Sequence, residues 1–358
     1  MRIGLLGLPN SGKKTIFRLL TRGGAGGPVF SAERPLAGVG HIYDARFDAL
    51  VVKYRPQKTT RASITIDLLQ DASADALREG SIFRDIAGMD ALCCVVRAFR
   101  DDSVYHPSGS VDPARDSAMI FSELALHDLL FVEKRLDRLK SQAKKPGAGL
   151  PNREEELMLR MKEHLENELP LRTLAATGDE LKTIAGYPLI TLKKMIIAAN
   201  VSEEDLPDGR PSASELRERW TSHEVSVMHL SARLESEIAA LEDEKERGAF
   251  MAAAGIAEPA IDLLSRTCMD ALGRLSFFTV GEDEVRQWLV RRGASAREAG
   301  GAIHSDIQRG FIRAEVMKYA DLMDLGSEEA VKKSGKMLLM GKDYTVEDGD
   351  IICFRFNV

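Results

Sequence analysis

Residues 2–20 read RIGLLGLPNSGKKTIFRLL, and they carry the strongest signal in the chain. The apolar run at 2–8 predicts a short buried strand, and the Gly, Pro and Asn residues after it predict a turn. The apolar residues of IFRLL then recur with helical spacing. Between strand and helix stands Gly7-x-x-x-x-Gly12-Lys13. That spacing predicts a phosphate-binding loop, because backbone N–H groups and a helix N-terminus there favour an anion.

The loop supplies most of the candidate nucleotide-binding residues. We expect Lys13 to reach the β and γ phosphates. The alternative is an ordinary glycine turn with a lysine at a helix start, but the strand, the spacing and the helix all agree with phosphate binding. The candidates in this stretch are Gly7, Asn10, Ser11, Gly12, Lys13, Lys14 and Thr15.

The position after Lys13 departs from the motif, which needs Ser or Thr there to place a hydroxyl on Mg²⁺. This sequence has Lys14, whose ammonium cannot ligate a cation. Thr15 carries a hydroxyl, but its side chain lies about 100° further round the helix. Asp67 is the candidate metal carboxylate, acting through water, and we prefer it to Asp85 of the DIAG tetrapeptide. Mg²⁺ is therefore a doubtful cofactor.

The length of 358 residues predicts two or three domains. Strand-like runs at 62–68, 91–99, 195–200 and 225–231 alternate with helical segments, which is typical of a mostly parallel sheet with helices on both faces. A charged helical pattern at 118–185, broken by PGAGLP, predicts an inserted antiparallel helical hairpin. We thus expect a nucleotide-binding domain at 1–117 and 186–274, the hairpin at 118–185, and a small α+β domain at 275–358.

The bulk composition excludes several classes of protein. A formal net charge of −6 argues against a chain that coats nucleic acid, so DNA is not an expected partner. The four cysteines lack CxxC spacing, which argues against a zinc site. The start of the chain has no signal-peptide pattern, and no apolar run reaches the roughly 18 residues of a membrane span. We therefore expect a cytoplasmic protein without a membrane partner.

The loop sequence GLPNSGKKT is similar to the GLPNVGKST loop of the YchF, or Obg-like, ATPases, and the likeness continues along nearly the whole chain. MDALCCVVRAF at 89–99 and SVDPARD at 110–116 resemble that family's VDAI…VVRCF and VDPxRD segments. Segments at 277–281, 301–306, 310–316, 341–344 and 348–358 resemble its C-terminal domain. The resemblance implies an α/β P-loop NTPase domain, an inserted helical hairpin and a C-terminal TGS-like β-grasp domain.

Asn200-Val201-Ser202-Glu203 resembles the family's NxxE base-recognition motif, and Ser231-Ala232 resembles its base-lining turn. Related GTPases have NKxD, in which Asp accepts from both guanine donors, and a longer Glu would be displaced from that geometry. The resemblance therefore implies ATP as the preferred ligand, read partly by backbone near Val201, with GTP as the alternative. Without the loop, Asn200 and Glu203 would be interpreted as a strand-end turn and a helix cap.

The sequence departs from the family's pattern at four places, all of which concern Mg²⁺ or the γ-phosphate. Lys14 replaces the metal-binding Ser, Ala32 stands at the switch I Thr, Gln70 stands at the Gly of DIAG, and the switch II stretch is shorter. Two hypotheses follow. One is a slowly hydrolysing ATPase, in which Lys14 neutralises phosphate charge in the metal's place; the other is a hydrolysis-deficient nucleotide sensor or partner-binding module. No catalytic residue is assigned.

The resemblance also implies the ribosome, and hence rRNA, as a partner. Basic residues that could meet RNA phosphates gather near the hairpin tip and in the C-terminal domain. Each cluster alone is more typical of a solvated helical face, so the ribosome is inferred from the resemblance and not from charge. These residues are Lys140, Lys144, Lys145, Arg291, Arg292, Lys332 and Lys333.

Overall fold

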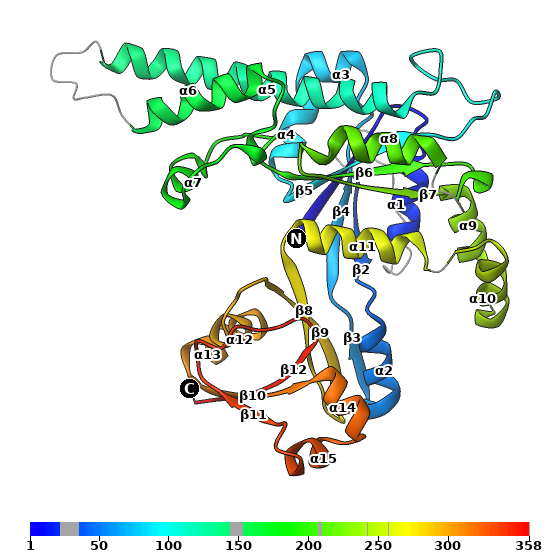
Figure 1. Ribbon diagram of the computed structural model, residues 1–358, viewed down its shortest axis with the longest axis vertical. Helices are drawn as coiled ribbons and strands as arrows, with labels where there is room; N and C mark the ends of the chain where they lie inside the picture. Colours follow the sequence, from blue (N-terminus) through cyan, green and yellow to red (C-terminus); the bar gives the residue numbers. More distant parts are fainter. Residues whose placement is uncertain (22–35, 144–152, 207–209, 242, 257, 358) are drawn as a thin grey trace. The chain divides into compact units, whose positions relative to one another are not determined.

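The structure, a computed structural model, describes residues 1–358 except 22–35, 144–152, 207–209, 242, 257 and 358. Ala32, Lys144 and Lys145 lie outside the described residues. The chain folds into two compact units, one made of Met1–Gly40 and Thr65–Ile261 and the other of His41–Ile64 and Asp262–Val358. Each unit has its own six-stranded sheet (Figure 1).

The sheet of the first unit has the strand order β2-β4-β1-β5-β6-β7. Strands β4, β1, β5, β6 and β7 run parallel, which confirms the predicted parallel α/β sheet. Parallel strands bring their carboxyl ends to one edge, where ligands of such sheets bind. The strands are β1 (Arg2–Leu6), β2 (Leu36–His41), β4 (Ser63–Leu68), β5 (Ala91–Arg97), β6 (Lys194–Asn200) and β7 (Val225–Leu230).

Helices cover this sheet, and one core cluster joins β5 and β6 to the apolar sides of three of them through Ile82, Ile120 and Leu216. The helices and 3₁₀ turns of the unit are α1 (Lys13–Leu20), α3 (Ala74–Glu79), α4 (Ser81–Ala87), α5 (Pro113–Ala143), α6 (Arg153–Glu166), η1 (Leu171–Thr173), α7 (Gly178–Ile184), η2 (Glu203–Asp205), α8 (Arg210–Thr221), α9 (Ala232–Ala240) and α10 (Glu244–Ala253).

Helices α5 and α6 lie side by side, as the charged helical pattern predicts (Figure 1). Their apolar residues, including Val132, Leu136 and Met158, form a core cluster together with Leu171 and Ile184 of the segment that follows α6. The fully buried Asp128 ties helix α5 to the segment just before β6. Its carboxylate accepts from the Ile190 N–H at 2.9 Å, and from the N–H and hydroxyl of Thr191 at 2.7 Å each.

The second unit is a mixed sheet in the order β11-β10-β12-β8-β9-β3 with helices packed against it. Its edge strand β3 comes from the N-terminal half of the chain and runs parallel to β9. Its elements are α2 (Ala45–Tyr54), β3 (Lys58–Thr60), α11 (Ala260–Ala271), β8 (Arg274–Thr279), β9 (Glu284–Arg291), α12 (Ala296–Ile303), α13 (Ser305–Arg309), β10 (Phe311–Lys318), α14 (Tyr319–Leu325), α15 (Glu328–Lys333), β11 (Leu338–Met340) and β12 (Asp350–Phe356).

The domain boundaries expected from the sequence stay a prediction, but residues 41–64 pack with the C-terminal residues. Phe47 and Leu50 of α2 share a core cluster with Phe278 and Ile351. The N–H groups of Gln57 and Lys58 donate to the carbonyls of Glu282 and Asp283, which extends the pairing of β3 with β9. Among the described residues, no helix has both the length and the apolar character that crossing a bilayer requires.

Candidate functional site

The Gly7–Lys13 loop connects β1 to α1 at the carboxyl edge of the parallel sheet. Asn10 and Gly12 have φ of 62° and 91°, a left-handed conformation that turns the chain back into the helix. Helix α1 begins with no side-chain cap and with no acidic residue in its first turn. Its N-terminus therefore presents free N–H groups and a positive dipole end, which together suit an anion.

A pocket of about 260 Å³ lies over this helix start. It contains most of the predicted loop residues and adds residues from two other segments, which the sequence analysis did not select. The lining residues are Leu8, Asn10, Ser11, Gly12, Lys13, Lys14, Thr15, Asp71, Phe99 and Val104.

Lys13 is almost fully buried, and protein groups hold its ammonium on three sides. Nζ donates to the Leu69 carbonyl at 2.7 Å and to the Gln70 carbonyl at 2.9 Å. The Asp71 carboxylate lies 3.1 Å from the same atom. Burial lowers the pKa of Lys13, although Asp71 opposes that shift. A lysine has three donors, so a phosphate that binds Nζ must displace one of these partners.

Lys14 and Thr15 follow on the wall of the same pocket. Lys14 is exposed and forms no ion pair with any described residue. Thr15 is partly buried and also lines the pocket, although its side chain lies further round the helix than the motif hydroxyl would. The two side chains thus offer one free cation and one hydroxyl near the helix start.

Asp67, the candidate metal carboxylate, lies elsewhere. It pairs in register with Gly4 in the middle of the sheet and is 1 % exposed. Its two oxygens accept from Arg2, from Nη2 at 2.6 Å and from Nε at 3.1 Å. It does not line the pocket. Asp85 is a half-buried residue inside α4.

The residues at the loop do not fit an ordinary Mg²⁺ site. A phosphate-loop metal is held by a hydroxyl at the first helical turn and by a carboxylate from a neighbouring strand. Here the hydroxyl position is Lys14, Asp67 is bound by Arg2, and Asp71 is bound to Lys13. Within the described part of the chain, no three His, Cys, Asp or Glu side chains gather as a metal-ligating group.

Asn200 joins the loop to the turn after β7. Its Nδ2 donates to the Ser11 carbonyl at 3.0 Å, and its Oδ1 accepts from the Ala232 N–H at 3.0 Å. Ser231 caps α9 by accepting the Leu234 N–H. The sequence predicts Asn200, Ser231 and Ala232 at one site, and the structure brings them together with the loop.

Val201 and Glu203, the other two predicted base-binding residues, are placed less directly for that role. The Val201 N–H donates to the Leu230 carbonyl at 2.8 Å, so a backbone contact from Val201 to a base would use its carbonyl oxygen. Glu203 is exposed in the short turn η2, and it is not among the residues that line the pocket.

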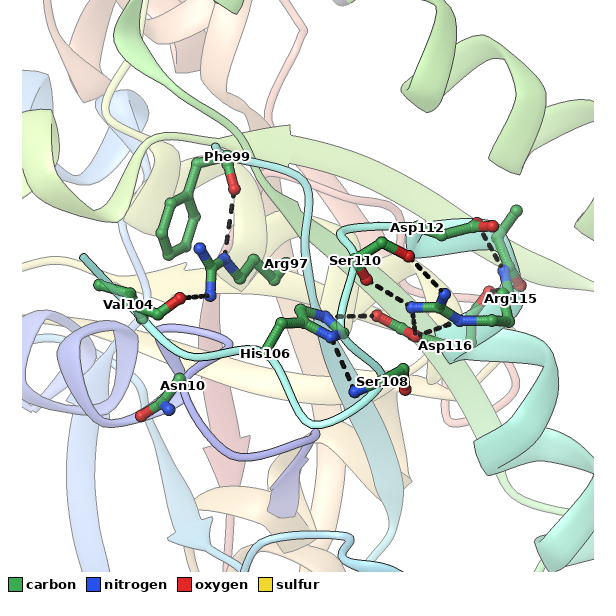
Figure 2. Close-up of polar contacts among 12 residues, drawn as sticks. Asn10, Arg97, Phe99, Val104, His106, Ser108, Ser110, Asp112, Arg115 and Asp116 are labelled. Carbon is green, nitrogen blue, oxygen red and sulfur yellow. Dashed lines mark hydrogen bonds and ion pairs between the residues drawn. The ribbon is translucent and has the colours of Figure 1, made fainter. Parts of the chain in front are cut away.

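A loop at residues 98–112 forms one wall of the pocket, and the buried Arg97 organises it (Figure 2). The guanidinium donates to four backbone carbonyls, those of Phe99, Asp101, Val104 and Tyr105, at 2.9 to 3.4 Å. Asn10 donates to the Tyr105 carbonyl at 3.1 Å, which ties the wall to the phosphate loop.

The far end of this wall is tied to helix α5 (Figure 2). His106 Nδ1 accepts the Ser108 N–H at 3.1 Å, so its proton is on Nε2, which lies 3.0 Å from the Asp116 carboxylate. Arg115 donates to the other oxygen of Asp116. The sequence analysis missed His106 and Arg97; a lone histidine in a loop and an arginine at a strand end carry little signal.

The chain is similar over its full length to curated proteins named for one family. It is 38 % identical to "Ribosome-binding ATPase YchF" of Bacillus subtilis (strain 168), covering 99 % of each chain. It is 35 % identical to the protein of that name from Escherichia coli O157:H7, covering 100 % of this chain and 99 % of that one. It is 34 % identical to "Obg-like ATPase 1" of Oryza sativa subsp. japonica, covering 100 % and 92 %.

Two further comparisons agree. A family model named YchF-GTPase_C and described as "Protein of unknown function (DUF933)" matches residues 275–357. A solved structure titled "Structure of the Schizosaccharomyces pombe YchF GTPase" superposes with a TM-score of 0.86 at 30 % identity, covering 99 % of this chain and 97 % of that one.

Replacing Asn200 should loosen the loop from the turn after β7. Asn200→Ala removes both bonds and leaves the buried Ala232 N–H unpaired, so we expect a loss of about 1–3 kcal/mol in the free energy of unfolding. Asn200→Asp keeps the acceptor for Ala232 but faces the Ser11 carbonyl with a carboxylate. Hydrogen exchange should therefore speed up at Ala232 in the Ala variant only; equal protection of Ala232 in both variants would contradict the bridge.

Proposed function

The chain belongs to the YchF family, and from that membership we propose that it binds ATP in preference to GTP in the Gly7–Lys13 loop and works on the ribosome. The observation that carries the proposal is the uncapped start of α1 beneath a pocket lined by Asn10 to Thr15. Free N–H groups, Lys13 and Lys14 supply what triphosphate oxygens need. The preference for ATP is supported by Glu203 in the NxxE motif.

In this proposal, Lys14 takes over the neutralising role of the metal. It is exposed at the pocket wall and without an ion pair in the described chain, so it is free to meet a phosphate. An ammonium supplies charge without coordination geometry, so ATP would bind without Mg²⁺ and hydrolyse slowly, because the transition state loses a positioned cation.

A test of this role compares ATP affinity in EDTA with affinity in excess Mg²⁺ by calorimetry. We expect the unmodified chain to differ by less than about threefold between the two, because Lys14 needs no metal. Lys14→Ser restores the motif hydroxyl and should make binding at least about tenfold tighter with Mg²⁺ than without it. Lys13→Ala, the control, should weaken binding at least about tenfold in both buffers. If the unmodified chain bound ATP only in the presence of Mg²⁺, the proposed role of Lys14 would be wrong.

The second candidate function is a nucleotide sensor that does not hydrolyse. It is favoured by the Arg2–Asp67 ion pair, which engages both oxygens of the carboxylate expected near the metal. Single-turnover hydrolysis of ATP decides between the two functions. Turnover that disappears in Lys13→Ala supports the slow ATPase, whereas no turnover above that variant's background supports the sensor.

Asp71 should oppose ATP binding, because its carboxylate lies against the ammonium that the phosphates need. Asp71→Asn keeps the size of the side chain and removes its charge. We expect ATP affinity to rise about fivefold, since relieving even ~1 kcal/mol of repulsion has that effect, and ADP affinity to rise less. Asp75→Asn, an exposed acid on α3, controls for general loss of charge. Weaker ATP binding in Asp71→Asn would show that Asp71 assists the nucleotide.

Ribosome association is proposed from the names of the relatives. The described basic residues near the hairpin tip and in the C-terminal domain, such as Lys140 and Lys332, are consistent with contacts to rRNA phosphates. We expect the chain to co-sediment with salt-washed ribosomes, with a bound fraction that falls steeply as the salt concentration rises. The absence of co-sedimentation in every nucleotide state, with and without ATP, would contradict this part of the proposal.

A further inference from the structure

A larger hollow of about 530 Å³ lies in the first unit, away from the phosphate loop. It is bounded by α5, by the segment that follows α6, and by the end of α8, and it shares no lining residue with the loop pocket. Its walls are mainly apolar, with Phe121, Leu129, Met195 and Trp220 among them. This volume is in the range of sites that hold small organic ligands.

Arg172 gives this apolar hollow a positive group. Its Nε donates to the His223 carbonyl at 2.8 Å, and its Nη1 donates to the carbonyls of Thr191 and Lys193 at 3.2 and 3.4 Å. Nη2 donates to no described residue, and no described carboxylate lies within ion-pair distance of the guanidinium. Burial lowers the pKa of Arg172 to about 10, so the group stays charged at neutral pH.

The walls beside Arg172 are rigidly held. Thr191 is fixed from the other side by Asp128, which accepts from its N–H and its hydroxyl. Trp220 packs edge-on against Phe121 with ring centroids 4.3 Å apart. Because Arg172 itself donates to three carbonyls, its guanidinium has little freedom to turn, and an incoming group would meet it in a fixed orientation.

The other charges near the hollow do not cancel Arg172. Glu224, whose charge opposes the effect of burial on the pKa of Arg172, is half exposed and lies 2.9 Å from Lys194. Glu166 is 53 % exposed and already lies 3.6 Å from Lys162, and Glu168 is exposed, so water screens both carboxylates. Arg219 adds a second cation at the rim. Burial and the neighbouring Arg172 lower the pKa of His223, which keeps its ring neutral at neutral pH.

We propose that this hollow is a second ligand site, which takes a small amphipathic carboxylate with its head group on Arg172 and its apolar chain against Phe121, Leu129 and Trp220. A carboxylate matches the unpaired N–H of a guanidinium with a charge-assisted hydrogen bond, and the low local dielectric strengthens that bond. The apolar walls stabilise the hydrocarbon part by removing it from water. This site is independent of the nucleotide function proposed above.

Tryptophan fluorescence tests the site, because the chain has two tryptophans and one of them, Trp220, lines the hollow. Trp288→Phe leaves Trp220 as the only reporter. In this parent protein, titration with decanoate should change the emission saturably, and decanol, which has the same chain without the charge, should bind at least about tenfold more weakly. Equal affinity for the two probes, or no binding of either, would overturn the proposal.

Variants in the same parent locate the binding. Arg172→Met should bring decanoate to the affinity of decanol, whereas Arg233→Met, which removes an exposed cation on α9, should change nothing. Ala125→Phe should fill the hollow from α5 and abolish binding of both probes. Because Arg172 also holds three carbonyls, thermal melting must show that its variant folds. If it does not, the Ala125→Phe result and the comparison of decanoate with decanol still decide.

Two more outcomes separate this proposal from others. Lys13→Ala should leave decanoate affinity unchanged, so failure of nucleotide binding and failure of this site are distinguishable. A Trp220 spectrum that depends on protein concentration in the absence of probe would show that a second copy of the chain covers the hollow, and would overturn a small-molecule site. Retained decanoate binding in Ala125→Phe would place the binding elsewhere and overturn it too.

Discussion

The close approach of Asn200 to Gly12 sets the shape of the phosphate loop. A Cβ at position 12 would lie 2.1 Å from Asn200 Nδ2, and the backbone there has a φ of 91°. Only glycine satisfies both constraints. Since the same Asn200 amide also accepts from Ala232, the ends of β1, β6 and β7 become one rigid edge. The glycine of the motif is therefore dictated by a residue far along the chain.

Much of this edge was predictable from the sequence because strand and loop patterns are local. The period of the apolar residues predicts the parallel strands, and the spacing of Gly7, Gly12 and Lys13 predicts the turn. The family resemblance is confirmed over the whole length, and it correctly implies the fold. The predicted nucleotide-binding residues remain a prediction, although the structure brings the loop, Asn200 and Ala232 together.

The partners of the charged side chains were not predictable. Arg2 meets Asp67 only because β1 and β4 pair in a particular register, and Asp71 meets Lys13 only because the chain bends after β4. Both contacts join residues more than fifty positions apart, and no local pattern encodes them. The pairing of β3 with the C-terminal sheet was missed for the same reason, since a strand of three residues is too short to show an alternating pattern of apolar and polar residues. These long-range pairs set the charges around the loop, so the sequence says more about the position of the candidate site than about its electrostatics.

Arg97 has a consequence for how the wall of the pocket can evolve. Its guanidinium donates hydrogen bonds only to main-chain oxygens, and two side chains of the segment assist it: the Phe99 ring lies under the guanidinium with its centroid 4.5 Å away, and the Asp101 carboxylate accepts from the N–H and hydroxyl of Ser103. Main-chain contacts of this kind do not depend on side-chain identity, so substitutions elsewhere along the wall can change its polarity and bulk while the backbone keeps its course. Val104, which lines the pocket, can thus be replaced without redirecting the loop, provided that Arg97 is retained.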